Sequence, residues 1–246
     1  IKIDSANYVY VCGGTASNDF PTTPGTINTG YLGGKADGYI VKIDTNGTQL
    51  LASTIIGTND YDQCYFLEID RFGSIYTVGQ TRGVFPIINA PYSNINSSNF
   101  IMRLNTDLTT IDYSTIFGNG NINAKFSPSA FLVDRCENVY VSGWGGDILT
   151  GVSLNGMPTT PNAVFPNSPN GFDFYLIVLE RNVQSLLYGT YFGGNLSREH
   201  VDGGTSRFDK NGIVYQSVCA GCQNNDDFPT TPGAWSAVNN STGCNN

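Results

Sequence analysis

The chain is poor in charge and in histidine, and it contains no long apolar run. Charged residues make up 13% of the sequence, against roughly 25% in an ordinary soluble domain. No stretch of about 18 consecutive apolar residues occurs, so the sequence predicts no membrane insertion through a helix. His200 is the one histidine among 246 residues, which excludes metal sites built from several imidazoles.

Basic residues are scarce as well. The 12 Lys and Arg residues stand against 20 Asp and Glu residues, which gives a net charge of −8. A phosphate backbone is repelled by such a field, so we expect no nucleic-acid partner. The chain opens on Ile1-Lys2-Ile3-Asp4 without an initiator Met or an apolar signal segment, and it stops within a repeat unit. We therefore expect the native protein to be longer in both directions.

Glycine, proline and aromatic residues are abundant instead. There are 29 Gly and 11 Pro residues, and they interrupt nearly every window in which a helical pattern would have to appear. Aromatic residues make up 12% of the chain, which is too many for a disordered segment. The composition therefore predicts an all-β fold that is dense in turns.

Four segments of similar sequence recur along the chain. Each begins with an aspartate before a turn and a Tyr-containing strand, and these aspartates are Asp4, Asp70, Asp134 and Asp209. A Phe/Met-Pro-Thr-Thr-Pro stretch, an apolar strand and a Ser/Gly-Thr-x-x-Gly strand follow in the same order. Four short strands in a unit of about 65–75 residues are typical of one propeller blade. In each turn, we expect the aspartate to accept backbone N–H groups and Gly or Asn to take the left-handed position.

We accordingly predict a β-propeller built of four-stranded antiparallel blades. The expected units are 1–63, 64–127, 128–199 and a partial fourth unit over 200–246. Propellers close with about four to eight blades. We interpret the chain as an incomplete arc of a larger ring, taken here as seven-bladed.

These motifs resemble the SBBP-type β-propeller repeat. The resemblance is carried by Tyr-Val-Tyr-Val-Cys-Gly at 8–13, Asp-Phe-Pro-Thr-Thr-Pro-Gly at 19–25, Asp-Gly-Tyr-Ile-Val-Lys-Ile at 37–43 and Tyr-Gly-Thr-Tyr-Phe-Gly-Gly at 188–194. Residues 199–222 are similar to the last repeats of large Bacteroidota surface proteins of the gliding-motility adhesin kind. The resemblance implies a propeller fold, no catalytic residues, type IX secretion and a place at the cell surface. Unit 2 departs from the pattern at 86–91, so we expect its loop to be shaped differently.

The six cysteines leave two interpretations open. Cys219-x-x-Cys222 is typical of zinc ligands, but a structural zinc site needs two further ligands at close spacing, and only Cys244 follows. An exported protein with disulfides is the preferred interpretation. Cys222 and Cys244 flank one Pro-Thr-Thr-Pro loop, and we predict a disulfide between them.

His200 lies where the fourth unit begins, close in sequence to Glu199, Asp202 and Arg207. A histidine beside a carboxylate can serve in hydrolysis, and two carboxylates about 5–10 Å apart can serve a glycosidase. No Gly-x-Ser-x-Gly nucleophile motif accompanies them. The favoured interpretation is a loop histidine bonded to backbone, and a polysaccharide-active site at the channel mouth is the alternative.

The first strand of each unit is expected to line the central channel. Alternation then places Glu68 and Arg207 toward the channel with Lys2, as candidate ligand-binding residues, and packs four apolar residues between blades, namely Ile3, Ile69, Val133 and Phe208. Trp144 follows a second strand, where an exposed ring can stack on a sugar. Packing between blades is the favoured role for Trp144, and likewise for Trp235.

We expect no cofactor and no metal. The acidic segments at 59–62 and 224–227 are rich in the oxygen ligands that Ca²⁺ takes, but neither has the full Asp-x-Asp-x-Asp-Gly spacing, so calcium is not predicted. The preferred hypothesis is a non-enzymatic extracellular binding module that contacts glycan or protein ligands through propeller-face loops. The alternatives are the polysaccharide-active enzyme and a purely structural spacer or secretion-cargo domain.

Overall fold

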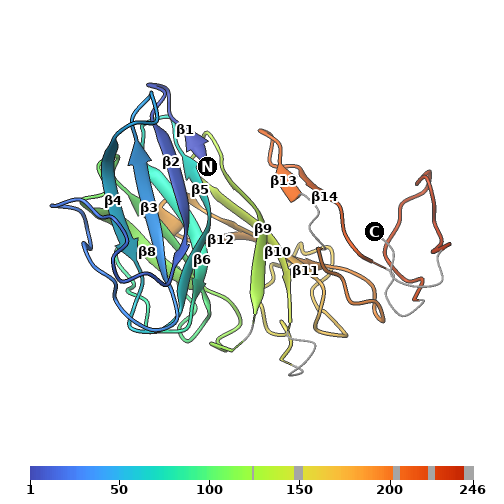
Figure 1. The fold of residues 1–246 in the computed structure, drawn as a ribbon. Coiled ribbons are helices and arrows are strands. Elements are labelled where there is room, and N and C mark those ends of the chain that lie inside the picture. The colour runs from blue at the N-terminus through green and yellow to red at the C-terminus, as the bar shows by residue number, and fades with distance from the viewer. Residues whose placement is uncertain (124, 147–151, 202–205, 221–224, 241–246) are drawn as a thin grey trace.

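A computed structural model of the chain describes residues 1–246 except 124, 147–151, 202–205, 221–224 and 241–246. The described part is all-β, with three four-stranded antiparallel sheets, one two-stranded sheet and a single three-residue 3₁₀ turn, η1 (Arg181–Val183). The sheets follow one another along the chain (Figure 1). Their strands are β1 (Lys2–Ile3), β2 (Val9–Thr15), β3 (Asp37–Ile43), β4 (Leu50–Ile56), β5 (Asp62–Ile69), β6 (Ile75–Thr81), β7 (Asn99–Leu104), β8 (Ile111–Phe117), β9 (Phe126–Val133), β10 (Val139–Gly145), β11 (Phe174–Leu179), β12 (Leu186–Phe192), β13 (Ser206–Phe208) and β14 (Val214–Gln216).

The turn between the first and second strand of each unit is closed by its aspartate. In all four turns one carboxylate oxygen accepts two backbone N–H groups, as when Asp70 Oδ1 accepts from Phe72 at 2.8 Å and from Ser74 at 2.9 Å. The predicted capping is therefore confirmed. The left-handed residue is Asn7, Gly73 or Gly212 in three of the turns. In the third turn the expectation of Gly or Asn is wrong, because Glu137 adopts φ 66° there.

The Pro-Thr-Thr-Pro loops run back along the fourth strand of their own unit. Thr23 N donates to Ser53 O at 3.1 Å in unit 1, and Thr160 N donates to Gly189 O at 3.1 Å in unit 3. Unit 2 follows the same path, since Ile88 N donates to Ser114 O at 2.8 Å. The expectation that its loop is shaped differently is wrong. These segments cover β4, β8 and β12, which would otherwise be open sheet edges.

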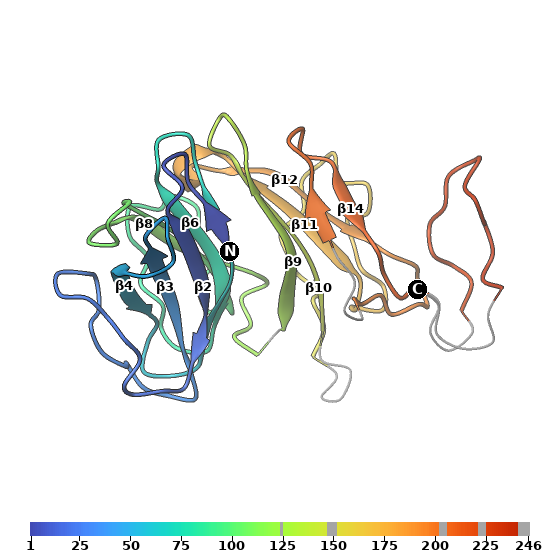
Figure 2. The same cartoon turned by 45° about the horizontal axis from the view of Figure 1, so that its top comes forward.

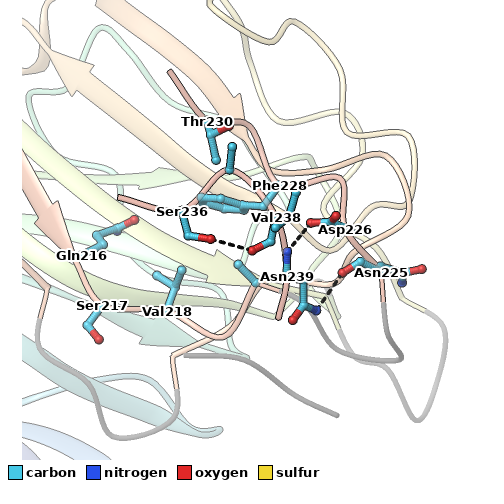
Figure 3. Close-up of a pocket in the computed structure, with 12 residues that line it drawn as sticks. Gln216, Ser217, Val218, Asn225, Asp226, Phe228, Thr230, Ser236, Val238 and Asn239 are labelled. Carbon is cyan, nitrogen blue, oxygen red and sulfur yellow. Dashed lines mark hydrogen bonds between the residues drawn. The ribbon is translucent and has the colours of Figure 1, made fainter. Parts of the chain in front are cut away.

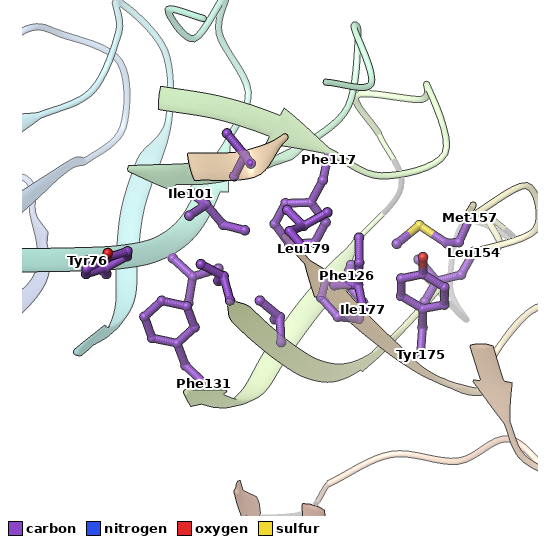
Figure 4. Packing of buried hydrophobic residues seen from close by; sticks show 14 of the residues in the cluster. Tyr76, Ile101, Phe117, Phe126, Phe131, Leu154, Met157, Tyr175, Ile177 and Leu179 are labelled. Atoms are coloured by element: carbon purple, nitrogen blue, oxygen red, sulfur yellow. The ribbon is translucent and has the colours of Figure 1, made fainter. Parts of the chain in front are cut away.

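The core lies between consecutive sheets, whose facing side chains interlock. Tyr10, Ile40 and Ile56 of the first sheet meet Leu67 and Phe100 of the second. On the other face of the second sheet, a cluster of buried rings and branched side chains meets the third sheet (Figure 4). The predicted alternation in β6 is confirmed, because Ile75 belongs to the first cluster whereas Tyr76 and Val78 belong to the second.

The first strands lie side by side, so that β1 contacts β5, β5 contacts β9 and β9 contacts β13. Ile69 and Val133 pack against the cores between sheets as predicted, and the ring of Phe208 lies 5.8 Å from that of Tyr140. The prediction for Ile3 is wrong. Its side chain is 61% exposed, because it lies on the face of the first sheet that is turned away from the second.

The fourth unit contributes two strands, β13 and β14, to the described fold (Figure 2). Its Pro-Thr-Thr-Pro segment has no fourth strand beside it, and Trp235 just beyond that segment is fully exposed, contrary to the packing expected for it. The sheets form a blade-like array that does not close into a ring within the described residues. Among these residues no helix is long and apolar enough to cross a membrane.

Candidate functional site

Trp144 and His200 come together at the joint between units 3 and 4. Trp144 lies near the end of β10, and its ring centroid is 5.9 Å from that of His200. The backbone of His200 is bonded to Cys219, with His200 N donating at 3.2 Å and Cys219 N donating back at 2.9 Å. Both side chains are half-buried. The contact agrees with the packing role that the sequence favoured for Trp144.

The two predicted channel residues stay apart. Glu68 on β5 forms an ion pair with Lys2 on β1, as their common direction predicted. Burial raises the pKa of Glu68, and the Lys2 ammonium opposes that shift. Arg207 is exposed on β13, opposite Tyr215, and β9 lies between the strands that carry Glu68 and Arg207. Asp202 and the predicted disulfide partners Cys222 and Cys244 lie outside the described residues.

Glu199 is buried against Asp173 rather than open to solvent. Its exposed fraction is 1% and that of Asp173 is 2%. Gly193 makes the approach of the two carboxyl groups feasible, since a Cβ there would lie 2.6 Å from Glu199 Oε2 and 2.7 Å from Asp173 Cγ. Burial raises the pKa of both groups, and the hydrogen bond between them favours a proton on Glu199. The pair can share one proton inside the joint. The geometry thus gives Glu199 a buried partner in place of an open cleft.

An equivalent acidic pair joins units 1 and 2. Asp37 at the start of β3 and Asp62 at the start of β5 are both fully buried. A Cβ on Gly57 would lie 2.6 Å from Asp37 Oδ1 and 3.0 Å from Asp62 Oδ2. Burial is the main cause that raises the pKa of each carboxyl group. Carboxyl pairs are therefore part of the construction of two joints.

The four described cysteines, Cys12, Cys64, Cys136 and Cys219, are all free thiols. Cys12 and Cys64 belong to the core between units 1 and 2, and burial raises the pKa of the Cys12 thiol to about 11. Within the described ranges no group of three or more His, Cys, Asp or Glu side chains is arranged to hold a metal ion. Asp62 and Asp227, from the two acidic segments considered for calcium, instead accept backbone N–H groups, for example from Thr58 at 2.6 Å and from Ser197 at 3.1 Å.

A cavity of about 440 Å³ lies between β14 and the Pro-Thr-Thr-Pro segment of unit 4 (Figure 3). Val218, Phe228 and Val238 give it an apolar wall, and Asn239 N donates to Asp226 Oδ1 at 2.5 Å across its rim. In the first three units, the third and fourth strands lie between the second strand and this segment. The cavity therefore lies at the position that two strands occupy in the other units.

A second cavity, of about 560 Å³, lies at the long-loop end of units 1 to 3. We call it the basic cleft, after Lys35, Arg82 and Lys125, which line it together with Asp60, Tyr61, Gln80, Ile122 and Asn123. Backbone bonds bring its loops together. Asp62 N donates to Ala36 O at 2.7 Å, Arg82 N donates to Tyr61 O at 2.8 Å, and Gly146 N donates to Lys125 O at 2.9 Å.

The sequence analysis did not single out any residue of the basic cleft. Its three basic residues come from three different loops, each following or preceding a strand that the repeat pattern identifies. Only the registration of one unit against the next brings these loops to a common end. The repeat itself was the one feature of the sequence that could have indicated the cleft.

Comparisons with known proteins give no relative for this chain: no family model matches it, and a search of curated proteins finds no match.

Proposed function

We propose that the chain is part of a closed β-propeller whose further blades belong to the same, longer protein. Three features support this proposal. The first strands of successive units lie side by side, the outer face of the first sheet leaves Ile3 exposed, and the fourth Pro-Thr-Thr-Pro segment lacks the edge strand that the other three cover. The motifs that resemble SBBP repeats suggest a surface protein of Bacteroidota exported by type IX secretion, of the gliding-motility adhesin kind.

Within that frame, the proposed function is non-enzymatic binding of a glycan or a surface protein outside the cell. The observation that carries the proposal is the basic cleft, which several loops form at one end of a rigid array. Binding residues on loops that a packed scaffold positions are a common arrangement. The carboxylate considered for catalysis, Glu199, is instead buried against Asp173.

The test is a binding screen with the full chain. An array of neutral and acidic glycans, together with a pull-down of surface proteins, should give at least one ligand whose binding is lost when loop residues of the basic cleft are changed. The matched control carries changes in the short turns at the opposite end, such as Arg71→Ala. A blank array and a blank pull-down would contradict the binding role and favour a structural spacer.

A further inference from the structure

The basic cleft gathers positive charge on a protein that is acidic as a whole. Three of the 12 basic residues of the chain line it, against one of the 20 acidic residues, Asp60. The local balance is thus positive while the net charge of the chain is −8. Because exposed charges farther away than about 8 Å are largely screened at physiological salt, a ligand in the cleft experiences this local balance first.

Two of these cations have no acidic partner within the protein. Lys2, Lys42, Arg103 and Arg181 all pair with carboxylates, whereas neither Lys35 nor Arg82 forms an ion pair within the described residues. Lys35 is exposed and Arg82 is half-buried. In a chain with so many carboxylates, two unpaired cations beside one cavity are a feature that an anionic ligand would satisfy.

Arg82 is also oriented for such a ligand. Its backbone is fixed by the bond to Tyr61 O, and its Nη1 donates to Asn123 Oδ1 at 3.3 Å. This bond uses one of the five N–H groups of the guanidinium, whose planar fork suits carboxylate and sulfate groups. Tyr61 is held at the rim by its hydroxyl, which donates to Gln63 Oε1 at 2.7 Å. An amphipathic ring beside charged donors suits a sugar, which presents C–H groups and hydroxyls together.

The size of the cleft fits a short stretch of polymer. Its volume of about 560 Å³ is within the range of roughly 300–1,000 Å³ found for ligand sites. An apolar cavity lined by Val84, Ile87 and Ile95 adjoins it and shares Asp60, Arg82 and Ile122 with it. The two cavities form one continuous recess, so a chain-like ligand can extend beyond the charged part.

We propose that the basic cleft binds an acidic glycan, one whose sugars carry carboxylate or sulfate groups, with Lys35, Arg82 and Lys125 contacting the anionic groups and Tyr61 contacting a sugar ring. This inference rests on the proposed binding function and names the ligand class for the same site.

The test compares two triple variants of the full chain. Lys35→Ala/Arg82→Ala/Lys125→Ala removes three positive charges from the basic cleft. Arg71→Ala/Arg135→Ala/Lys210→Ala removes three positive charges from exposed residues of the short turns and is the matched control. The probes are polygalacturonate, its methyl-esterified form, dextran sulfate and a poly-glutamate peptide, each measured at low and at high NaCl. Circular dichroism checks that each variant is folded.

We expect polygalacturonate or dextran sulfate to bind the unchanged chain, and the cleft variant to lose affinity by about tenfold or more, since several charge-assisted contacts disappear together. The control variant should bind as the unchanged chain does, and high NaCl should weaken binding. Preference for polygalacturonate identifies carboxylate sugars as the source, whereas preference for dextran sulfate identifies sulfated sugars. Arg82→Lys keeps the charge but removes the fork, so it should weaken binding by a smaller factor.

Three results would overturn the proposal. The first is equal affinity for polygalacturonate and its methyl ester, and the second is an equal loss of affinity in both triple variants. The third is equally tight binding of poly-glutamate, which would point to an acidic peptide. If neutral glycans or a protein ligand bind and the cleft variant has no effect, the inference fails while the binding function stands. If no ligand of any kind binds, both fail.

Discussion

Glu137 shows how a single residue departs from the repeat for a reason that lies in another unit. Its left-handed backbone is a conformation that glycine and asparagine adopt more readily, and strain of this kind costs about 1–3 kcal/mol. The buried carboxylate lies 3.3 Å from Arg103 Nη1 and 3.3 Å from Arg181 Nε. These two charge contacts offset the strain. The sequence predicts the turn from Asp134, but it does not predict Glu137 at this position, because Arg103 lies 34 residues away.

At the same scale, the acidic pair of Glu199 and Asp173 makes stability depend on pH. Burial raises the pKa of Glu199 above that of the unfolded chain, so the folded state keeps a proton that the unfolded state loses as pH rises above about 4.3. The free energy of unfolding must therefore fall with rising pH from that point upward, by at most about 1.4 kcal/mol per pH unit for one proton. Glu199→Gln removes this proton and should flatten the profile, as measured by urea unfolding at a series of pH values.

The control for this experiment is Glu180→Gln, since the Glu180 carboxylate accepts from Ser185 Oγ in an exposed turn. Other groups with raised pKa values, Asp37 and Asp62 among them, contribute to the same profile, so the comparison is between slopes and not between single points. A slope for Glu199→Gln that equals that of the unchanged chain would contradict the shared proton.

At the scale of the element, the segments that cover β4, β8 and β12 solve one problem in two ways. In units 1 and 2 a serine of the edge strand donates to the covering segment, with Ser53 Oγ bonded to Pro21 O at 2.6 Å and Ser114 Oγ bonded to Pro86 O at 2.7 Å. In unit 3 the edge residue is Gly189, and the hydroxyl of Tyr175 donates to Pro158 O at 2.5 Å instead.

Gly189→Ser would restore the residue of the other units, yet we expect it to destabilise the protein. A Cβ at this position would lie 2.3 Å from Pro158 O, so the covering segment would have to move. Overpacking of this kind costs about 1–3 kcal/mol. The measurement is the midpoint of thermal unfolding, with Ser53→Gly as the reciprocal control that loses one hydrogen bond. A rise in the midpoint for Gly189→Ser would show that the covering segment tolerates the side chain.

The sequence predicts the strands and turns well but misses the path of these loops. Alternation and the Asp-x-x-Gly turns are local features, and both are confirmed. Pairing of Thr23 with Ser53 joins residues 30 apart in the chain, and no local pattern in the Pro-Thr-Thr-Pro motif indicates which partner it takes. The motif was expected to present a binding loop, whereas it protects an edge.

At the scale of the whole molecule, Arg103 ties the second unit to the third. Its guanidinium lies within 3.7 Å of Asp70 in its own unit and bonds Glu137 and Asn182 of the next. The equivalent position in unit 1 is Lys42, whose partner Asp107 is 3.7 Å away with its side chain 76% exposed. The same position thus supports two joints with different amounts of buried charge.

We expect Arg103→Ala to lower the free energy of unfolding by about 3–5 kcal/mol, because it leaves the buried Glu137 carboxylate without its main partner. Lys42→Ala should cost about 1 kcal/mol or less, since pairs with an exposed partner contribute little. Both are measured by denaturant unfolding. Equal costs for the two variants would mean that burial of Glu137 does not decide the strength of the joint.

The basic cleft belongs to this largest scale as well, because it exists only where three units meet. The sequence analysis chose Trp144 and His200, which do meet, and Glu68 and Arg207, which do not. It found the pair at one joint because both residues stand at the ends of recognisable repeats. It could not find Lys35, Arg82 and Lys125, because each is an unremarkable loop cation until neighbouring units are set in register.

The covering segments also bear on how such a protein can grow during evolution. Each of the first three units holds, within its own sequence, both an edge strand and the segment that shields it. A gene duplication that adds one unit therefore adds its protection in the same step. The array can lengthen or shorten by whole units without passing through an ancestor that exposes a bare edge to aggregation.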